Sequence, residues 1–111
     1  MACWPRRRKR RGVRYKVRYT RVARDDLKRL FSFLAGHDLL AAQRAHKAIA
    51  TSMTLLQQFP YTCRKATPEN PFLRELIISF GVAGYVALFE IEDDETISIL
   101  AIRHQREDDY L

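Results

Sequence analysis

Apolar and cationic residues alternate without exception over residues 13–19. Every odd-numbered position is Val or Tyr, and every even-numbered position is Arg or Lys. A period of two places the apolar side chains on one face of an extended chain and the charged ones on the other. The pattern predicts a β-strand with one buried face.

The next apolar positions recur with a helical period. Thr20 is a suitable N-cap, and Gly36 could end a helix that spans about residues 21–35. Asp25 and Asp26 would lie in the first turns, where a carboxylate complements the helix dipole. The predicted buried face consists of Ala23, Leu27, Leu30, Phe31 and Leu34.

A second helix is predicted from Asp38, as its cap, to the residue before Pro60. The three residues between the two helices indicate an antiparallel pair. The small side chains on this helix would allow the helices to approach closely. Its predicted apolar stripe consists of Ala42, Ala45, Ile49, Met53 and Leu56.

The period changes after the second helix. Residues 60–71 contain three prolines and no apolar period, so they are predicted to form a loop. Residues 72–80, 85–92 and 96–103 are rich in β-branched and aromatic residues, with turns at 81–84 and 93–94. This order predicts an α+β domain, β-α-α-β-β-β, with a helical hairpin packed on one face of a mainly antiparallel four-stranded sheet.

The length of 111 residues suits one domain, here residues 13–111, preceded by a flexible basic arm over residues 1–12. Cys3 and Cys63 form no metal-binding or disulfide spacing, which favours a reduced, cytoplasmic setting. The uncharged run over residues 76–89 is too short to span a bilayer and contains two glycines. We expect no cofactor, no metal and no membrane association.

The net charge of +7 is unevenly distributed. Residues 1–65 hold 17 basic and 3 acidic side chains, whereas residues 66–111 hold 3 basic and 10 acidic ones. A bipolar surface attracts and orients a charged partner.

The chemistry is densest at the C-terminus, where the last apolar strand leads into a polar cluster. This cluster contains Arg103, His104, Arg106, three carboxylates and Tyr110. The histidine could act as an acid or a base near neutral pH, or it could hold a nearby carboxylate or carbonyl at the strand end. His37 and His46 have no metal-binding spacing and are predicted to be helix-surface or capping residues.

Six segments in this order resemble the RelE/ParE superfamily of bacterial type II toxins, in particular its ParE-like branch of plasmid stabilisation toxins. The resemblance covers essentially all of residues 13–111. The segments are Tyr15–Thr20, Ala23–Phe31, Gln58–Pro60, Leu73–Leu76, Gly84–Phe89 and Ile102–Tyr110.

The resemblance implies one of two targets. RelE-like toxins are ribosome-dependent endoribonucleases, and ParE-like toxins are associated with poisoning DNA gyrase. RNA cleavage needs a base, an acid and cations around the phosphate. RelE-type ribonucleases carry an arginine where this chain has Val86, and no lysine follows Lys65. The side chains therefore favour the ParE-like branch. For that branch the resemblance implies a non-enzymatic, growth-arresting inhibitor that binds DNA gyrase through the A subunit of gyrase.

Arginine and tyrosine are common anchors of protein interfaces. The predicted target-binding residues are Arg74, Arg103, Arg106 and Tyr110. Arg74 and Arg103 could instead pair with Glu75, Glu90 or the acids of the tail.

The resemblance also implies a ParD-like antitoxin with an acidic segment that folds on binding, and it leaves open a higher-order toxin–antitoxin assembly. A solvated surface is the alternative for each of the predicted antitoxin-binding residues, which are Arg14, Lys16, Arg18, Arg21, Arg24, Lys28 and Arg29.

Two other functions remain open from the sequence. The chain could be a RelE-like mRNA endoribonuclease whose catalytic residues are Arg103, His104, Arg106 and Tyr110. It could also be a degenerate member that serves only as an antitoxin-binding or DNA-repressing component.

Overall fold

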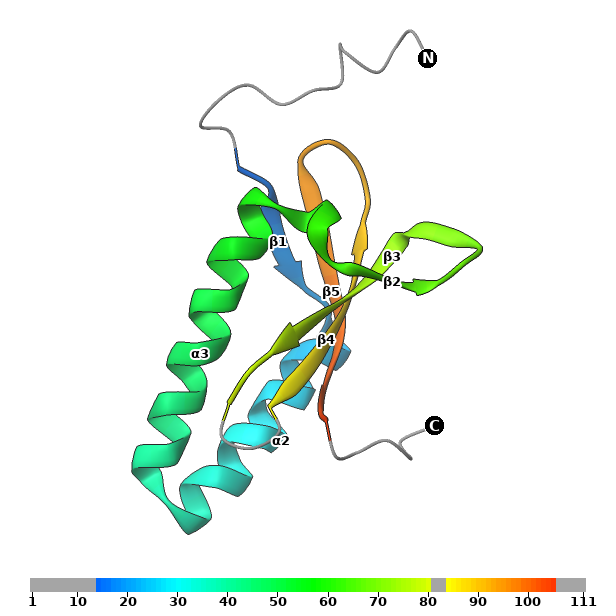
Figure 1. Ribbon diagram of the computed structural model, residues 1–111. Helices are drawn as coiled ribbons and strands as arrows, with labels where there is room; N and C mark the ends of the chain where they lie inside the picture. Colours follow the sequence, from blue (N-terminus) through cyan, green and yellow to red (C-terminus); the bar gives the residue numbers. More distant parts are fainter. Residues whose placement is uncertain (1–13, 81–83, 106–111) are drawn as a thin grey trace, which may run out of the picture.

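The structure is a computed structural model that describes residues 14–80 and 84–105. Two helices lie on one face of a five-stranded sheet, as Figure 1 shows. The basic arm predicted over residues 1–12 and most of the polar C-terminal cluster lie outside the described residues. The α+β class predicted from the sequence is confirmed.

The helices are α2 (Arg21–His37) and α3 (Leu39–Gln58), followed by the short 3₁₀ helix η1 (Pro60–Thr62). Thr20 caps α2 by accepting a hydrogen bond from the Ala23 amide, as predicted. Neither described helix combines the length and the apolar character that crossing a bilayer requires.

The link between the helices is shorter than predicted. α2 continues through Gly36 to His37, whose Nδ1 lies 2.9 Å from the Phe33 carbonyl oxygen. Asp38 alone separates the helices, and its carboxylate accepts from the amides of Leu40 and Ala41. The prediction that Gly36 ends the helix was therefore wrong. Asp38 is the C-cap of α2, and its amide donates to the Leu34 carbonyl.

The strands are β1 (Lys16–Tyr19), β2 (Arg64–Thr67), β3 (Asn70–Ile78), β4 (Tyr85–Ile91) and β5 (Thr96–His104). Their order across the sheet is β1-β5-β4-β3-β2. β1 pairs with β5 in parallel, and the other three pairs are antiparallel. The central strand is therefore β4.

The fifth strand, β2, occupies part of the segment that was predicted to be a loop. Its four residues, Arg64–Thr67, are too short and too polar to show an apolar period. Thr67 pairs with Asn70 across a two-residue turn, so β2 and β3 form a hairpin. β2 is a strand because it pairs with β3, and the spacing of apolar residues along the sequence cannot reveal such pairing.

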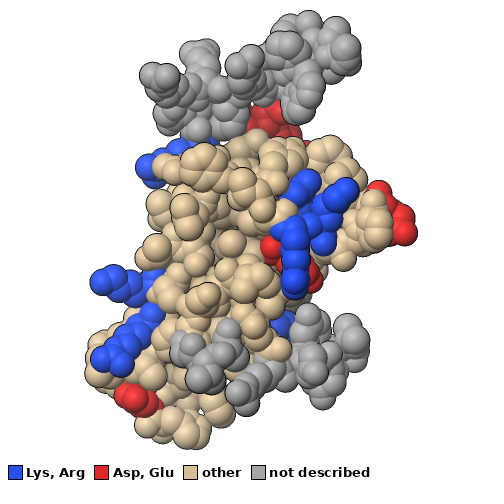
Figure 2. All heavy atoms as spheres, in the orientation of Figure 1, with Lys and Arg blue, Asp and Glu red and all other residues tan. Residues whose placement is uncertain are grey.

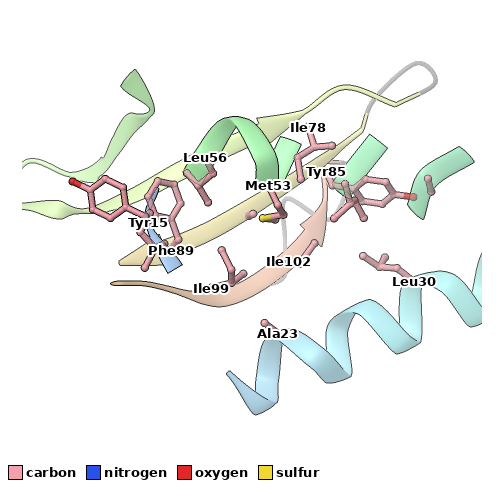
Figure 3. Packing of buried hydrophobic residues seen from close by; sticks show 14 of the residues in the cluster. Tyr15, Ala23, Leu30, Met53, Leu56, Ile78, Tyr85, Phe89, Ile99 and Ile102 are labelled. Atoms are coloured by element: carbon pink, nitrogen blue, oxygen red, sulfur yellow. The ribbon is translucent and has the colours of Figure 1, made fainter. Parts of the chain in front are cut away.

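The core lies between the helices and the sheet, where Figure 3 shows Ala23 and Leu30 of α2 on the side that faces Ile99 and Ile102 of β5. The five predicted stripe residues of α3 are all buried. On α2, Ala23 and Leu30 are buried, and Leu27, Phe31 and Leu34 are partly buried against the core. Both helix faces were thus predicted correctly.

Gly84, the residue before β4, has a φ of +101°. A Cβ atom there would lie 2.1 Å from the Ile78 carbonyl oxygen. Only glycine fits this close approach, which brings β3 and β4 together directly after the turn.

Candidate functional site

The end of β5 is held by a buried carboxylate from α2. Asp26 is only 7% exposed, and its Oδ2 accepts from the Ile102 amide (2.9 Å) and from Arg103 Nη1 (2.5 Å). Its other oxygen lies 3.8 Å from Arg29 Nη2. The Asp26 carboxylate is buried, and leaving it, the Arg103 guanidinium or the Ile102 amide without a partner would cost free energy. We therefore expect these hydrogen bonds to be strong.

Thr20 secures the same edge of β5 one step earlier. Its amide and its hydroxyl both donate to the Ile99 carbonyl, at 3.1 and 2.8 Å. β1 pairs with β5 only from Thr96 to Ile99. Where the pairing with β1 ends, the side chains of Thr20 and Asp26 therefore bind the backbone of β5.

His104, the last residue of β5, packs edge-on against Tyr85. The ring centroids are 5.5 Å apart, with an angle of 86° between the planes. Burial raises the pKa of the Tyr85 hydroxyl above its ordinary value of 10.0. The remaining predicted residues of this cluster, Arg106 and Tyr110, lie outside the described residues.

Arg74 makes a different set of contacts at the opposite end of the sheet. Its guanidinium donates to three carbonyl oxygens, those of Pro71 (2.7 Å), Tyr61 (3.2 Å) and Cys63 (2.6 Å). It also lies 5.2 Å from the centre of the Tyr61 ring. Arg74 thus ties η1 and the start of β2 to β3.

The surroundings of Arg74 also affect Cys63. Burial raises the pKa of the Cys63 thiol, and the positive charge of Arg74 offsets part of this shift. A protonated thiol is a weak nucleophile, so this position does not have the electrostatics of a reactive cysteine.

The structure does not bring the two predicted target-binding arginines together. Arg74 is in register with Phe89 of β4, a buried residue on the helix side of the sheet. Arg103 is in register with Val86, which points to the opposite face because side chains alternate along β4. The two arginines therefore start from opposite faces and bind different internal partners.

The sheet face away from the helices is poor in available cations. Its central strand, β4, presents Val86, Leu88 and Glu90 there, and none of the seven residues of β4 is cationic. Arg64 of β2 pairs with Glu75 at 2.8 Å, and Arg103 pairs with Asp26. Lys16 and Arg18 are in register with Thr96 and Ser98, at the edge strand.

The seven predicted antitoxin-binding residues are all exposed, but they divide between two surfaces. Lys16 and Arg18 alternate with Val17 and Tyr19, which pack against the core, so they face away from the helices. The cations of α2 project instead from the outer side of that helix. These α2 cations are Arg21, Arg24, Lys28 and Arg29.

Two features of these surfaces were missed at the level of sequence. Asp26 was assigned to the helix dipole, although its spacing from Ala23 and Leu30 places it on the apolar face of α2. A carboxylate at such a position signals a buried partner. The second feature is a groove between α3 and β3, which depends on how these elements pack.

Three comparisons with known proteins bear on this arrangement. Residues 17–109 match the sequence model of a family described as the ParE toxin of the type II toxin–antitoxin system parDE. No curated protein matches significantly. Among solved structures, a chromosomal ParDE toxin–antitoxin system from P. aeruginosa is similar, with a TM-score of 0.63 and 23% sequence identity. The match covers 81% of this chain and 95% of that one.

Proposed function

The chain belongs to the ParE toxin family of type II toxin–antitoxin systems, and from this premise we propose that it inhibits DNA gyrase without breaking a covalent bond. Gyrase inhibition is the usual role of ParE toxins. In this mechanism the toxin binds the enzyme, most readily its A subunit, and traps the cleaved-DNA intermediate. The toxin itself contributes contacts rather than an acid or a base.

This proposal rests on the composition of the sheet face that points away from the helices. Cleavage of a phosphodiester needs several cationic groups directed at one phosphate. In the described part of this face the central strand offers Val86, Leu88 and Glu90, while Arg64 and Arg103 each bind a carboxylate. A phosphate placed over β4 would meet apolar side chains and negative charge, because the exposed cations of this face, Lys16 and Arg18, lie on the edge strand β1.

Target binding is proposed to centre on the C-terminal end of β5. Asp26 holds Arg103 and the Ile102 amide in place, so the residues that follow start from a rigid base. Arg106 and Tyr110 are the proposed anchors there. Arg74 is a weaker proposal for target binding, because three backbone carbonyls already occupy its guanidinium.

We also propose that a ParD-like antitoxin neutralises the toxin in the cytoplasm. The similar P. aeruginosa structure is named as a ParDE system, which supports a partner of this kind. The exposed cations of β1 and α2 would attract an acidic antitoxin segment. Arg24 and Lys28 are representative of them.

Two assays on the full-length protein test the target. We expect inhibition of supercoiling and accumulation of cleaved DNA with purified gyrase, and no mRNA cleavage on programmed ribosomes. Tyr110→Phe should retain inhibition within about threefold, because the phenol transfers no proton in this mechanism. Ribosome-dependent cleavage with normal supercoiling would establish the ribonuclease function instead.

A further inference from the structure

The outer edge of β3 is open beyond the end of β2. Gly84 accepts a hydrogen bond from the Gln105 amide, which shows that the even-numbered residues of β4 bond toward β5 at this end. The odd-numbered residues Tyr85 and Ala87 therefore bond toward β3, where their partners are Ile78 and Leu76. The intervening residue, Ile77, must direct its amide and carbonyl away from β4, and so must Ser79.

No strand covers these groups among the residues that the structure describes. β2 reaches only as far as Arg64, which pairs with Glu75. Before Arg64 the chain turns away into η1, and the Cys63 carbonyl accepts from Arg74 instead of continuing the ladder. The position in line with β2 and next to Ile77 is therefore available to a further strand.

A groove of about 480 Å³ lies beside this open edge, between α3 and β3. Ile77 and Ser79 line one side, and Arg44, Lys47, Thr51 and Ser52 of α3 line the other. A smaller apolar pocket of about 180 Å³ lies farther along α3, bordered by Leu55, Phe59 and Leu76. Leu55, Phe59 and Ile77 are 56%, 54% and 43% exposed, so bulky apolar surface is accessible here.

The charge of this region selects the partner. Residues 39–68 contain Arg44, Lys47, Arg64 and Lys65 and no aspartate or glutamate. Arg64 is paired with Glu75 of β3, so the groove itself is flanked by Arg44 and Lys47. Figure 2 shows cationic side chains on both sides of an uncharged central strip, at the margin of α3 and over β2. A second copy of the chain would bring like charges together, whereas an acidic segment would be attracted.

We propose that an extended acidic peptide segment of the antitoxin adds as a sixth strand to the edge of β3 at Ile77 and Ser79. Its acidic side chains contact Arg44 and Lys47, and an apolar side chain enters the pocket next to Leu55. Main-chain hydrogen bonds supply affinity in this mode of binding, and the side-chain contacts supply selectivity. The inference rests on the proposed function only in naming an antitoxin as the source of the segment.

The probe for this surface is a synthetic peptide of alternating valine and glutamate, added to the full-length protein. Binding should slow hydrogen exchange of the Ile77 and Ser79 amides and should weaken with added salt. The double charge reversal R44E/K47E on α3 should lower peptide affinity about tenfold. The matched control R44K/K47R, which keeps a positive charge at both positions, should change it less than about twofold.

Each contrary outcome has a defined meaning. Equal losses in both double variants, protection along β1 instead of β3, or the absence of saturable binding would overturn the inference. Protection of Ile77 and Ser79 in the peptide-free protein, with a dimer in sedimentation, would show that a second copy occupies the edge and would also overturn it. Gyrase inhibition is measured on the same proteins without peptide, so loss of the proposed function is recognised separately.

Discussion

Within the described part of the chain, the two long strands β5 and β3 each have part of one edge that is not paired with another strand, and the two edges are covered differently. Each extends beyond a short neighbour, β1 for β5 and β2 for β3. On the β5 side, Thr20 binds the backbone carbonyl of Ile99 and Asp26 binds the backbone amide of Ile102. On the β3 side, no strand among the described residues pairs with the outer backbone groups of Ile77 and Ser79, and a groove lies beside them.

This difference separates a structural edge from one that is ready for a partner. Unpaired strand edges are liabilities that proteins normally cover with helices, charged side chains or bulges. The covered β5 edge belongs to the strand that carries Arg103 and His104. Leaving the β3 edge open, beside cations and exposed apolar side chains, is consistent with a surface that is covered only in a complex.

The largest expected effect comes from removing the cover of β5. Asp26→Ala should lower the free energy of unfolding by about 3 kcal/mol, because the Ile102 amide and the Arg103 guanidinium both lose their acceptor. Urea denaturation measures this change. The adjacent exposed residue supplies the control, and Asp25→Ala should cost less than about 0.5 kcal/mol. Similar losses in the two variants would show that the buried carboxylate is not special.

A smaller effect on stability is expected from removing the hydrogen bonds that Arg74 makes on the β3 side. Arg74→Ala should lower the free energy of unfolding by about 1–2 kcal/mol, because three carbonyl contacts and the Tyr61 contact disappear. Lys65 faces Arg74 across the strand pair and is exposed, so Lys65→Ala is the matched control. A cost as large as that of Asp26→Ala would remove the contrast between the two sides.

The smallest effect is expected in alkaline solution, where one tyrosine from each region can be compared. Burial raises the pKa of Tyr85 and of Tyr61, and Arg74 partly offsets the shift at Tyr61. A raised pKa in the folded state means that stability is fully present below the ordinary tyrosine pKa of 10.0 and declines as the pH rises through the folded-state pKa.

Tyr85→Phe should therefore reduce the alkaline loss of stability more than Tyr61→Phe, because Tyr85 is 2% exposed and Tyr61 is 48% exposed. Thermal melting temperatures measured from about pH 8 to about pH 11 provide the comparison. Parallel profiles for the two variants and the unaltered protein would argue against a contribution from either phenol.

Local patterns were sufficient for most of the fold. The stripe of α3 and the alternation of β1 could be predicted because burial on one face imposes a period on consecutive residues. β2 was missed because its four residues become a strand only through pairing with β3. The end of α2 was misplaced because Asp38 could serve as the cap of both helices.

The candidate site was less accessible to such reasoning. Arg74 and Arg103 could be selected as arginines on strands, but their partners are far away in the sequence or belong to the backbone. The carboxylate that binds Arg103 lies 77 residues earlier, at Asp26. No periodicity links positions so far apart.

The amino-acid sequence alone determined the helix faces, the order of the main elements, the charge asymmetry and the resemblance to the toxin family, because these depend on neighbouring residues or on residue type. Only the tertiary structure decided which arginines are engaged, which strand edge is covered and where the α3–β3 groove lies. These features arise when distant segments compete for the same hydrogen-bonding groups, and that competition is settled by packing in three dimensions.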